Sequence, residues 1–259
     1  MNINLSKLIK GALLMLATLL SACGGGSDGS SPVAVTNLPA QGLWGGNSGT
    51  GYPTIIMVLG DGTYYGVYMD KINQNTPLGF IQGTGTATAS PGTFSSSNLK
   101  NFFLGSTTVR SASLTVNYTA KQSFNGTITY EDKTSDTFNN SYSTVYETAP
   151  TLSALAGNYT GDATVLTVVN ISNTQLSVSS TGAITSTTDG CTLTGTATPR
   201  SEANAFNVSL AFSASGCNAA VAGKSMAGLG FYNSDTRQFF IMAPNAERSG
   251  GVFYVGVKP

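Results

Sequence analysis

The chain has 259 residues, of which only 9% are charged, with 12 basic side chains, 12 acidic side chains and no histidine. A chain without histidine cannot build a Ser-His-Asp or Cys-His catalytic group, nor a histidine-ligated metal site. No segment is basic enough to follow a phosphate backbone, which argues against nucleic acid as a partner.

The first 22 residues have the layout of an export signal. Lys7 and Lys10 are their only charges, and residues 11–20 form an unbroken small and apolar run. A run of about ten residues is too short for a bilayer core, which needs roughly 20. A positive start, a short apolar core and a boundary of small residues predict a signal peptide over residues 1–22 rather than a membrane helix.

The boundary itself is Leu20-Ser21-Ala22-Cys23, which resembles the lipobox of bacterial lipoproteins. The resemblance implies that the signal is cut before Cys23, and that this cysteine carries a diacylglycerol and an acylated amine. The partner is then membrane lipid. Gly24 stands where an inner-membrane retention signal would place Asp, which implies sorting to the outer membrane of the cell envelope, in either leaflet. Residues 23–40 are expected to form a flexible, lipid-anchored tether.

Beyond residue 40 the apolar pattern is typical of strands. Runs over 54–59 and 63–69 flank Asp61-Gly62, a strong hairpin signal. Runs over 228–232 and 236–242 flank another turn sequence, and residues 252–257 are expected to form a closing strand. The one helix-like piece covers 152–156, with Thr151 placed to cap it and Gly157 placed to end it.

Four pairs of short segments indicate an internal repeat. Residues 42–46 and 157–161 share the pattern G-x-aromatic-x-G, and residues 81–84 match residues 193–196. Two weaker pairs follow, 114–118 with 208–212 and 124–126 with 226–228. Because the order of the segments is kept, we expect a duplicated unit with loop insertions.

These patterns predict an all-β fold with two small antiparallel β-barrel or sandwich domains, over residues 41–150 and 151–259. The competing layout is one continuous β structure of about 16 strands. The absence of helical segments between the strands argues against a parallel sheet.

Cys191 and Cys217 are the other two cysteines. They bracket a loop of roughly 25 residues in a chain expected in an oxidising compartment, so we predict a disulfide between them. Two cysteines without histidine do not make an ordinary zinc site, and we expect no metal and no cofactor.

No pair of carboxylates suggests acid–base catalysis. Two carboxylates on one strand face need i, i+2 spacing, which no Asp or Glu pair in the chain has. Glu131 and Asp132 are adjacent, so in a strand they point to opposite faces. The sequence therefore nominates no catalytic residue.

The sequence Gly42-Leu43-Trp44 resembles the G-x-W that opens the first strand of lipocalin and avidin-like barrels. The resemblance implies that Trp44 closes one end of a barrel, and Tyr159 holds the matching place in the second unit. Both are candidates for a barrel plug or for lining a ligand cavity. The layout of a tether followed by two β units also resembles the two-lobed surface lipoproteins that bind host transferrin or complement factors.

Three functional hypotheses follow. The leading one is an outer-membrane-anchored, non-enzymatic lipoprotein that binds a protein, a glycan or a small apolar ligand, or supports an envelope assembly. The first alternative is a lipocalin-like carrier of small ligands. The second is an enzyme that acts on envelope polysaccharide through carboxylates. Two groups of aromatic residues belong either to the core or to a binding surface. The first is Tyr64, Tyr65 and Tyr68, and the second is Phe102 and Phe103.

Overall fold

The computed structural model describes residues 38–74, 76–166 and 169–259, and for residues 169–173 it describes the backbone alone. All described residues belong to one compact unit. Cys23, the signal peptide and most of the predicted tether therefore lie outside the described residues. Within the described part, no helix has the length and apolar character that a membrane span requires.

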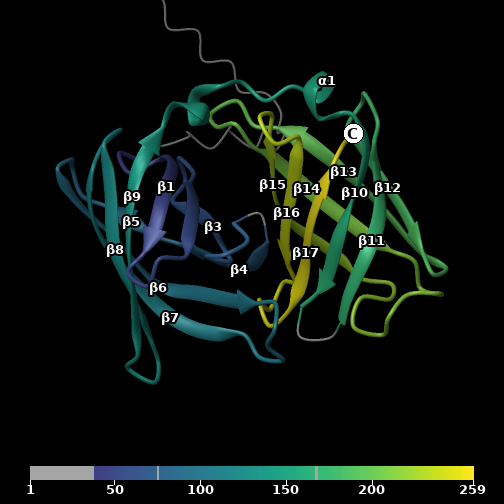
Figure 1. The fold of residues 1–259 in the computed structure, drawn as a ribbon, viewed down its shortest axis with the longest axis horizontal. Coiled ribbons are helices and arrows are strands. Elements are labelled where there is room, and N and C mark those ends of the chain that lie inside the picture. The colour runs from purple at the N-terminus through teal and green to yellow at the C-terminus, as the bar shows by residue number, and fades with distance from the viewer. Residues whose placement is uncertain (1–37, 75, 167–168) are drawn as a thin grey trace, which may run out of the picture. The chain divides into compact units, whose positions relative to one another are not determined.

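The first half of this unit is an antiparallel sheet that closes on itself (Figure 1). Its order is β4-β3-β2-β1-β9-β8-β7-β6-β5, and an additional pairing of β4 with β6 closes eight strands into a barrel, with β5 as a two-residue extra. The strands are β1 (Gly42–Ser48), β2 (Pro53–Val58), β3 (Thr63–Met69), β4 (Pro77–Thr84), β5 (Thr86–Ala87), β6 (Gly92–Phe103), β7 (Arg110–Thr119), β8 (Ser123–Tyr130) and β9 (Ser135–Ser143).

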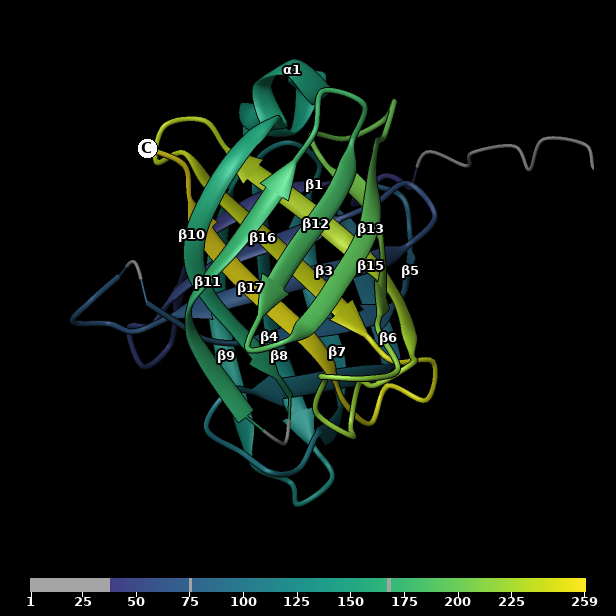
Figure 2. The same ribbon diagram turned by 90° about the vertical axis from the view of Figure 1, so that its right-hand side faces the viewer.

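The second half is a closed barrel of eight antiparallel strands in chain order, β10 to β17, seen from its side in Figure 2. The strands are β10 (Gly157–Val165), β11 (Val169–Val178), β12 (Ala183–Thr188), β13 (Cys191–Pro199), β14 (Phe206–Phe212), β15 (Ser225–Asn233), β16 (Gln238–Pro244) and β17 (Gly251–Val257). The predicted all-β, two-barrel fold is confirmed, and the alternative of one continuous 16-stranded structure is wrong.

Local sequence explains the turns and the one helical connection. Asp61 Oδ1 accepts a 2.8 Å hydrogen bond from the backbone N–H of Thr63, and Gly62 takes a φ of +85°, which favours glycine. Between the barrels lie η1 (Thr144–Glu147) and α1 (Leu152–Leu155). The Thr151 hydroxyl accepts from the N–H of Ala154 at 3.2 Å, so the predicted cap is confirmed.

The repeat is visible where each barrel closes. Gly46 pairs with the last strand of the first barrel, and Gly161 pairs with the last strand of the second. A Cβ at Gly46 would collide with the backbone oxygen of Asn139, and one at Gly161 would collide with that of Val255. Glycine at both places therefore lets the first and last strands approach closely.

The other sequence matches align only in part. Residues 81–84 and 193–196 both lie on the fourth strand of their barrels, β4 and β13. The weaker pairs do not correspond, because β7 and β8 are the sixth and seventh strands of the first closed barrel, whereas β14 and β15 are the fifth and sixth of the second. Alternating β sequences resemble one another whichever strand they form. The boundary predicted between residues 150 and 151 falls between η1 and α1 and stays a prediction, since both barrels belong to one compact unit.

Each barrel has its own apolar interior, to which all eight strands contribute. In the first barrel, the rings of Tyr64 and Tyr68 lie over Gly83 and Gly79 of the neighbouring strand, whose missing side chains make room for them. In the second barrel, Phe239 and Ile241 are fully buried in the interior. These apolar interiors fix the alternation of inward and outward residues along each strand.

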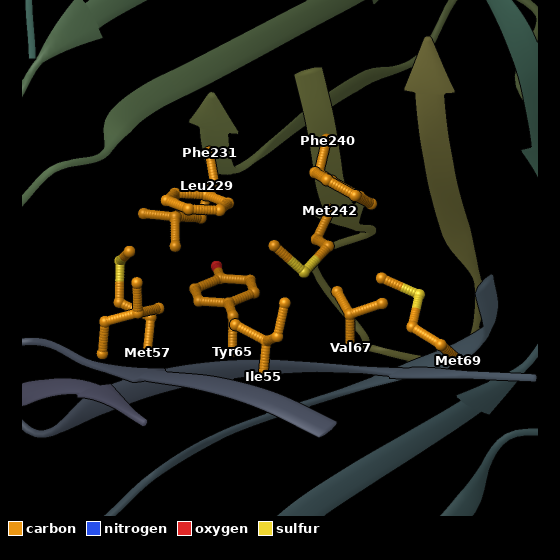
Figure 3. A pocket seen from close by; sticks show the side chains of 10 residues that line it. Ile55, Met57, Tyr65, Val67, Met69, Leu229, Phe231, Phe240 and Met242 are labelled. Atoms are coloured by element: carbon orange, nitrogen blue, oxygen red, sulfur yellow. The ribbon is translucent and has the colours of Figure 1, made fainter. Parts of the chain in front are cut away.

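A third apolar cluster lies between the two barrels (Figure 3). Strands β1 to β3 contribute Leu43, Ile55, Met57, Tyr65, Val67 and Met69, and strands β15 and β16 contribute Leu229, Phe231, Phe240 and Met242. The space left between these ten side chains is about 20 Å³, room for no more than one water molecule. This layer is therefore packing rather than a ligand site.

A half-buried arginine adds polar contacts across the same boundary. Arg248, in the turn between β16 and β17, donates from Nη2 to the carbonyl oxygens of Gln82 at 2.5 Å and Asn98 at 2.7 Å. Burial lowers the pKa of this guanidinium. The two accepting carbonyls belong to the first barrel, so the second barrel is tied to it by hydrogen bonds as well as by packing.

Candidate functional site

The first barrel is sealed at one end by an aromatic group around Trp44. Trp44 is fully buried, stacks on Phe124 at 5.1 Å between ring centroids, and meets the edge of Tyr142 at 5.3 Å. Its indole N–H donates to the carbonyl of Ala40 at 3.2 Å. The buried indole thus has the hydrogen-bond partner that it needs, and this end of the barrel is filled.

The opposite end is open. A cavity of about 390 Å³ lies among the ends of the same eight strands and the loops that join them. Its apolar wall is formed by Leu78, Ile81, Phe103, Ile128 and Phe138, and its polar lining by Ser48, Thr50, Tyr52, Thr54, Tyr68, Asn101, Ser106, Thr108, Arg110, Tyr130, Asp136 and Thr137. Concave sites with an apolar body and a few convergent polar groups are the usual form of small-molecule sites.

A chain of hydrogen bonds runs along this lining. The Tyr68 hydroxyl donates to Asn101 Oδ1 at 2.8 Å, and Asn101 Nδ2 donates to the Tyr130 hydroxyl oxygen at 2.7 Å. The Tyr130 hydroxyl in turn donates to Asp136 Oδ2 at 3.2 Å. Every donor in the chain points toward Asp136, so the carboxylate is the terminal acceptor.

The protonation of the chain follows from burial. Desolvation, assisted by the neighbouring Asp136 carboxylate, raises the pKa of Tyr130 to about 12. Desolvation is also the main cause that raises the pKa of Tyr68, and the nearby Tyr130 raises it further. Both hydroxyls therefore keep their protons at neutral pH and remain hydrogen-bond donors.

Arg110 limits the positive charge that the cavity offers. Its guanidinium lies 3.8 Å from the centroid of the Tyr130 ring and donates to Asp132 Oδ2 at 2.7 Å and to the Thr134 hydroxyl at 3.0 Å. Asp132 is not part of the lining. Because an external carboxylate neutralises Arg110, Asp136 is the lining charge without a paired cation among the described residues.

The rim of the cavity carries exposed apolar and aromatic groups. Phe103 keeps 45% of its surface exposed, and Lys71 Nζ lies 5.2 Å from the centroid of the Tyr52 ring. An apolar molecule that enters the cavity would therefore meet apolar surface before it reaches the polar chain.

The second barrel has the same plan with different contents. Tyr159 is buried at its closed end, packs near Tyr232 and Phe239, and donates from its hydroxyl to the carbonyl of Leu155. A cavity of about 290 Å³ lies inside this barrel. The disulfide Cys191–Cys217 joins the first residue of β13 to the loop between β14 and β15, beside that cavity.

The aromatic residues singled out in the sequence separate into three environments. Tyr64 and Tyr68 face the interior of the first barrel, whereas Tyr65 and Phe102 belong to the layer between the barrels. Phe103 lies on the rim of the open end. Trp44 and Tyr159 are buried in their barrel interiors and line neither cavity. That they act as barrel plugs stays a prediction.

Sequence reasoning missed Asn101, Tyr130 and Asp136. Nothing marks them as a group, because they lie on three strands and come together only when the barrel closes. The positions of Tyr130 and Asp136 near strand ends are the only local signal. In the described part of the chain, no group of three or more His, Cys, Asp or Glu side chains is arranged to hold a metal ion.

Comparisons with known proteins assign no family. No protein-family model matches the chain, and no curated protein sequence matches it. Among solved structures, it is similar to the isotype 1 transferrin binding protein B from serogroup B Neisseria meningitidis, with a TM-score of 0.28 and 12% identity. The alignment covers 81% of this chain and 66% of the other, so this chain spans slightly less than two thirds of that protein's length. A likeness at this level assigns no site or partner to this chain.

Proposed function

We propose that this chain is a non-enzymatic binding protein of the bacterial envelope, which takes a small, largely apolar ligand into the open end of the first barrel. The observation that carries the proposal is the cavity of about 390 Å³, which is sealed at the far end by Trp44 and lined by a hydrogen-bond chain ending on Asp136. Its volume lies within the range of roughly 300–1,000 Å³ that is usual for ligand sites.

The lining defines the chemistry of the ligand. The apolar wall favours a body of rings or alkyl groups, which gain free energy when they leave water. The lone pairs of Asp136 that Tyr130 does not use accept hydrogen bonds but cannot donate them. The site therefore suits a ligand that has an apolar body and a hydroxyl or amine hydrogen to donate to Asp136.

Binding is a better account of this cavity than catalysis. Among the described residues, Asp136 is the one carboxylate that lines the first cavity and Asp189 the one that lines the second. The mechanism considered for polysaccharide cleavage needs two carboxyl groups that face each other across the substrate. The single carboxylate in each cavity therefore supports ligand recognition.

The position of the protein in the cell is part of the proposal. The lipobox-like Leu20-Ser21-Ala22-Cys23 supports attachment of lipid to Cys23. A chain held in this way, with two or three acyl groups, stays on the membrane while the barrels remain in water. We infer that it acts at the outer membrane, where it binds or carries its ligand.

The proposal is tested with N-phenyl-1-naphthylamine, which has apolar rings and one N–H donor and fluoresces strongly in apolar surroundings. The full chain should bind it saturably. Ile128→Trp fills the cavity wall and should abolish this component of binding, whereas Asp136→Asn should weaken it by roughly tenfold through the lost charge.

Val145→Trp is the matched control, because it adds the same ring at an exposed position on η1, outside the cavity lining. It should bind the probe like the wild type. Circular dichroism and thermal unfolding establish that each variant is folded. The proposal fails if wild type shows no saturable binding, or if folded Ile128→Trp binds as tightly and with the same stoichiometry.

A further inference from the structure

Asp136 leaves the first cavity with one unbalanced negative charge. In the described part of the chain no cation forms an ion pair with it, and the hydrogen-bond chain through Tyr68, Asn101 and Tyr130 ends on it. Because every donor in this chain points toward the carboxylate, the chain stabilises its charged form. Asp136 is also exposed at the open end. The polar head of a ligand therefore reaches it while the apolar body stays inside.

The same cavity has an aromatic lining. Its rings are those of Tyr52, Tyr68, Phe103, Tyr130 and Phe138. The face of an aromatic ring carries negative partial charge and attracts cations. Two of these rings already hold cations of the protein, because Lys71 Nζ lies 5.2 Å from the centroid of the Tyr52 ring and the Arg110 guanidinium lies 3.8 Å from that of Tyr130. The lining is therefore suited to a positive charge at its rings as well as at Asp136.

The protein's own cations do not cancel the charge of Asp136. Arg110 donates to Asp132 Oδ2 at 2.7 Å, and this ion pair carries no net charge. Lys71 follows Asp70 in the chain, so its charge is offset as well. Of the described residues that line the cavity, Arg110 is the one cation, and its charge is already paired. The charges of the site therefore favour a cation and disfavour an anion.

From these observations we infer that the first barrel selects its ligand by charge. It takes molecules with an apolar body and a protonated amine as head, in preference to alcohols and carboxylates of the same shape. This inference rests on the function proposed for the cavity and names the class of its ligand. The body lies against apolar walls such as Ile128 and Phe138, and the ammonium lies at the open end, where it donates to Asp136. The body supplies affinity, and the head supplies specificity.

Three naphthalenes of similar shape test the inference: 1-naphthylmethylamine, 1-naphthylmethanol and 1-naphthoate. Each is titrated separately into the full chain at neutral pH and low salt, with calorimetry as the readout. The amine should bind roughly five- to tenfold more tightly than the alcohol, because it gains a charge-assisted hydrogen bond and a cation–π contact. The carboxylate should bind most weakly. Higher ionic strength should reduce the preference, since Asp136 lies at an exposed position.

Three variants identify the charge that is responsible. Asp136→Asn should abolish the preference for the amine over the alcohol, because the amide oxygen accepts a hydrogen bond without carrying a charge. Asp132→Asn keeps an oxygen for the backbone N–H of Thr134 but leaves Arg110 unpaired. It should bring the affinities of the amine and the carboxylate closer by roughly threefold. Asp235→Asn is the matched control, because it removes an exposed carboxylate between β15 and β16, outside the cavity lining, and should change neither affinity.

The outcomes separate this inference from the function proposed for the cavity. Saturable binding of all three naphthalenes with equal affinity, or tightest binding of the carboxylate, would overturn charge selection and leave the cavity as a ligand site. Binding of none of them by the folded wild type would overturn both. A preference for the amine that persists in folded Asp136→Asn would also overturn the inference, because the charge that selects the ligand would then lie elsewhere.

Discussion

Trp44 and Tyr159 make the same hydrogen bond in the two barrels. Each is the third residue of the first strand of its barrel, and each donates to the carbonyl of the residue four positions earlier, Ala40 or Leu155. The donor is an indole N–H in one case and a phenol O–H in the other. The segment that leads into each barrel is therefore fastened to a buried aromatic side chain, although the two aromatic residues differ.

The first prediction concerns this pair. Tyr159→Phe keeps the ring and removes only the hydrogen bond, so it should lower the free energy of unfolding by about 1 kcal/mol. Trp44→Phe also loses buried ring area against Phe124 and should cost about 2–3 kcal/mol. Urea denaturation measures both. Because neither residue lines a cavity, affinity for the naphthylamine probe should not change; a loss of affinity would place Trp44 in the ligand site instead.

The second prediction concerns alkaline pH. Burial raises the pKa of Tyr64 and of Tyr130 from 10.0 to about 12 in the folded protein. Below about pH 10 both states keep these protons, so this contribution to stability is fully present. Between pH 10 and about 12 the unfolded chain releases protons that the folded chain retains, so the free energy of unfolding should fall. Denaturation at several alkaline pH values measures it, and a flat profile up to pH 12 would contradict the assignment.

The third prediction concerns the layer between the barrels. Phe253 of β17 stacks on Phe80 of β4 at 5.8 Å between centroids, and Phe80 stacks on Phe102 at 4.5 Å. Phe253→Ala should therefore cost about 3–5 kcal/mol and separate one unfolding transition into two. Phe103→Ala is the control, because the Phe103 side chain is 45% exposed in the wild type. It should lower the free energy of unfolding by less than about 1 kcal/mol. Calorimetry distinguishes the cases, and an unchanged single transition in Phe253→Ala would show that this contact does not couple the barrels.

The fourth prediction concerns the disulfide. Replacing both Cys191 and Cys217 with Ala should cost about 3 kcal/mol, because the unfolded chain gains the freedom of a loop of 26 residues. The loss should appear in the unfolding of the second barrel. Probe binding in the first barrel provides the internal control and should be retained. Equal stability of the oxidised and doubly substituted chains would show that the loop is held by its packing alone.

The fifth prediction concerns the anchor. Cys23→Ser should move the protein out of the membrane fraction, because the acyl chains have no other proposed attachment site. Its persistence in membranes would contradict lipidation at Cys23. Proteolysis of intact cells then separates the two leaflets: digestion of the wild-type protein means that it faces outward, and protection until the outer membrane is opened means that it faces the periplasm.

The fold was predictable from local patterns that the structure then confirmed. The hairpin at Asp61-Gly62, the cap at Thr151 and the two G-x-aromatic-x-G segments each depend on a few neighbouring residues. The layer between the barrels also corresponds to a recognisable pattern in the sequence. Strands β2 and β16 are continuous apolar runs, typical of burial on both faces, whereas β7 alternates between buried and exposed residues.

The candidate sites were beyond this kind of reasoning. Tyr68 and Asn101 are 33 residues apart, and Asn101 and Tyr130 are 29 apart, so no local pattern connects them. They meet because barrel closure brings the ends of β3, β6 and β8 to one rim.

The sealed end of the first barrel has a consequence for how the protein can be attached. Ala40, which accepts the indole hydrogen bond, is where the chain enters, whereas Ser48 at the far end of β1 lines the cavity. Entry and opening are thus separated by the length of a seven-residue strand, about 23 Å. Under the proposed function, whatever lies upstream attaches at the pole near Trp44, and loading and release take place at the other. The proposed tether and the proposed ligand exchange would therefore not compete for the same surface.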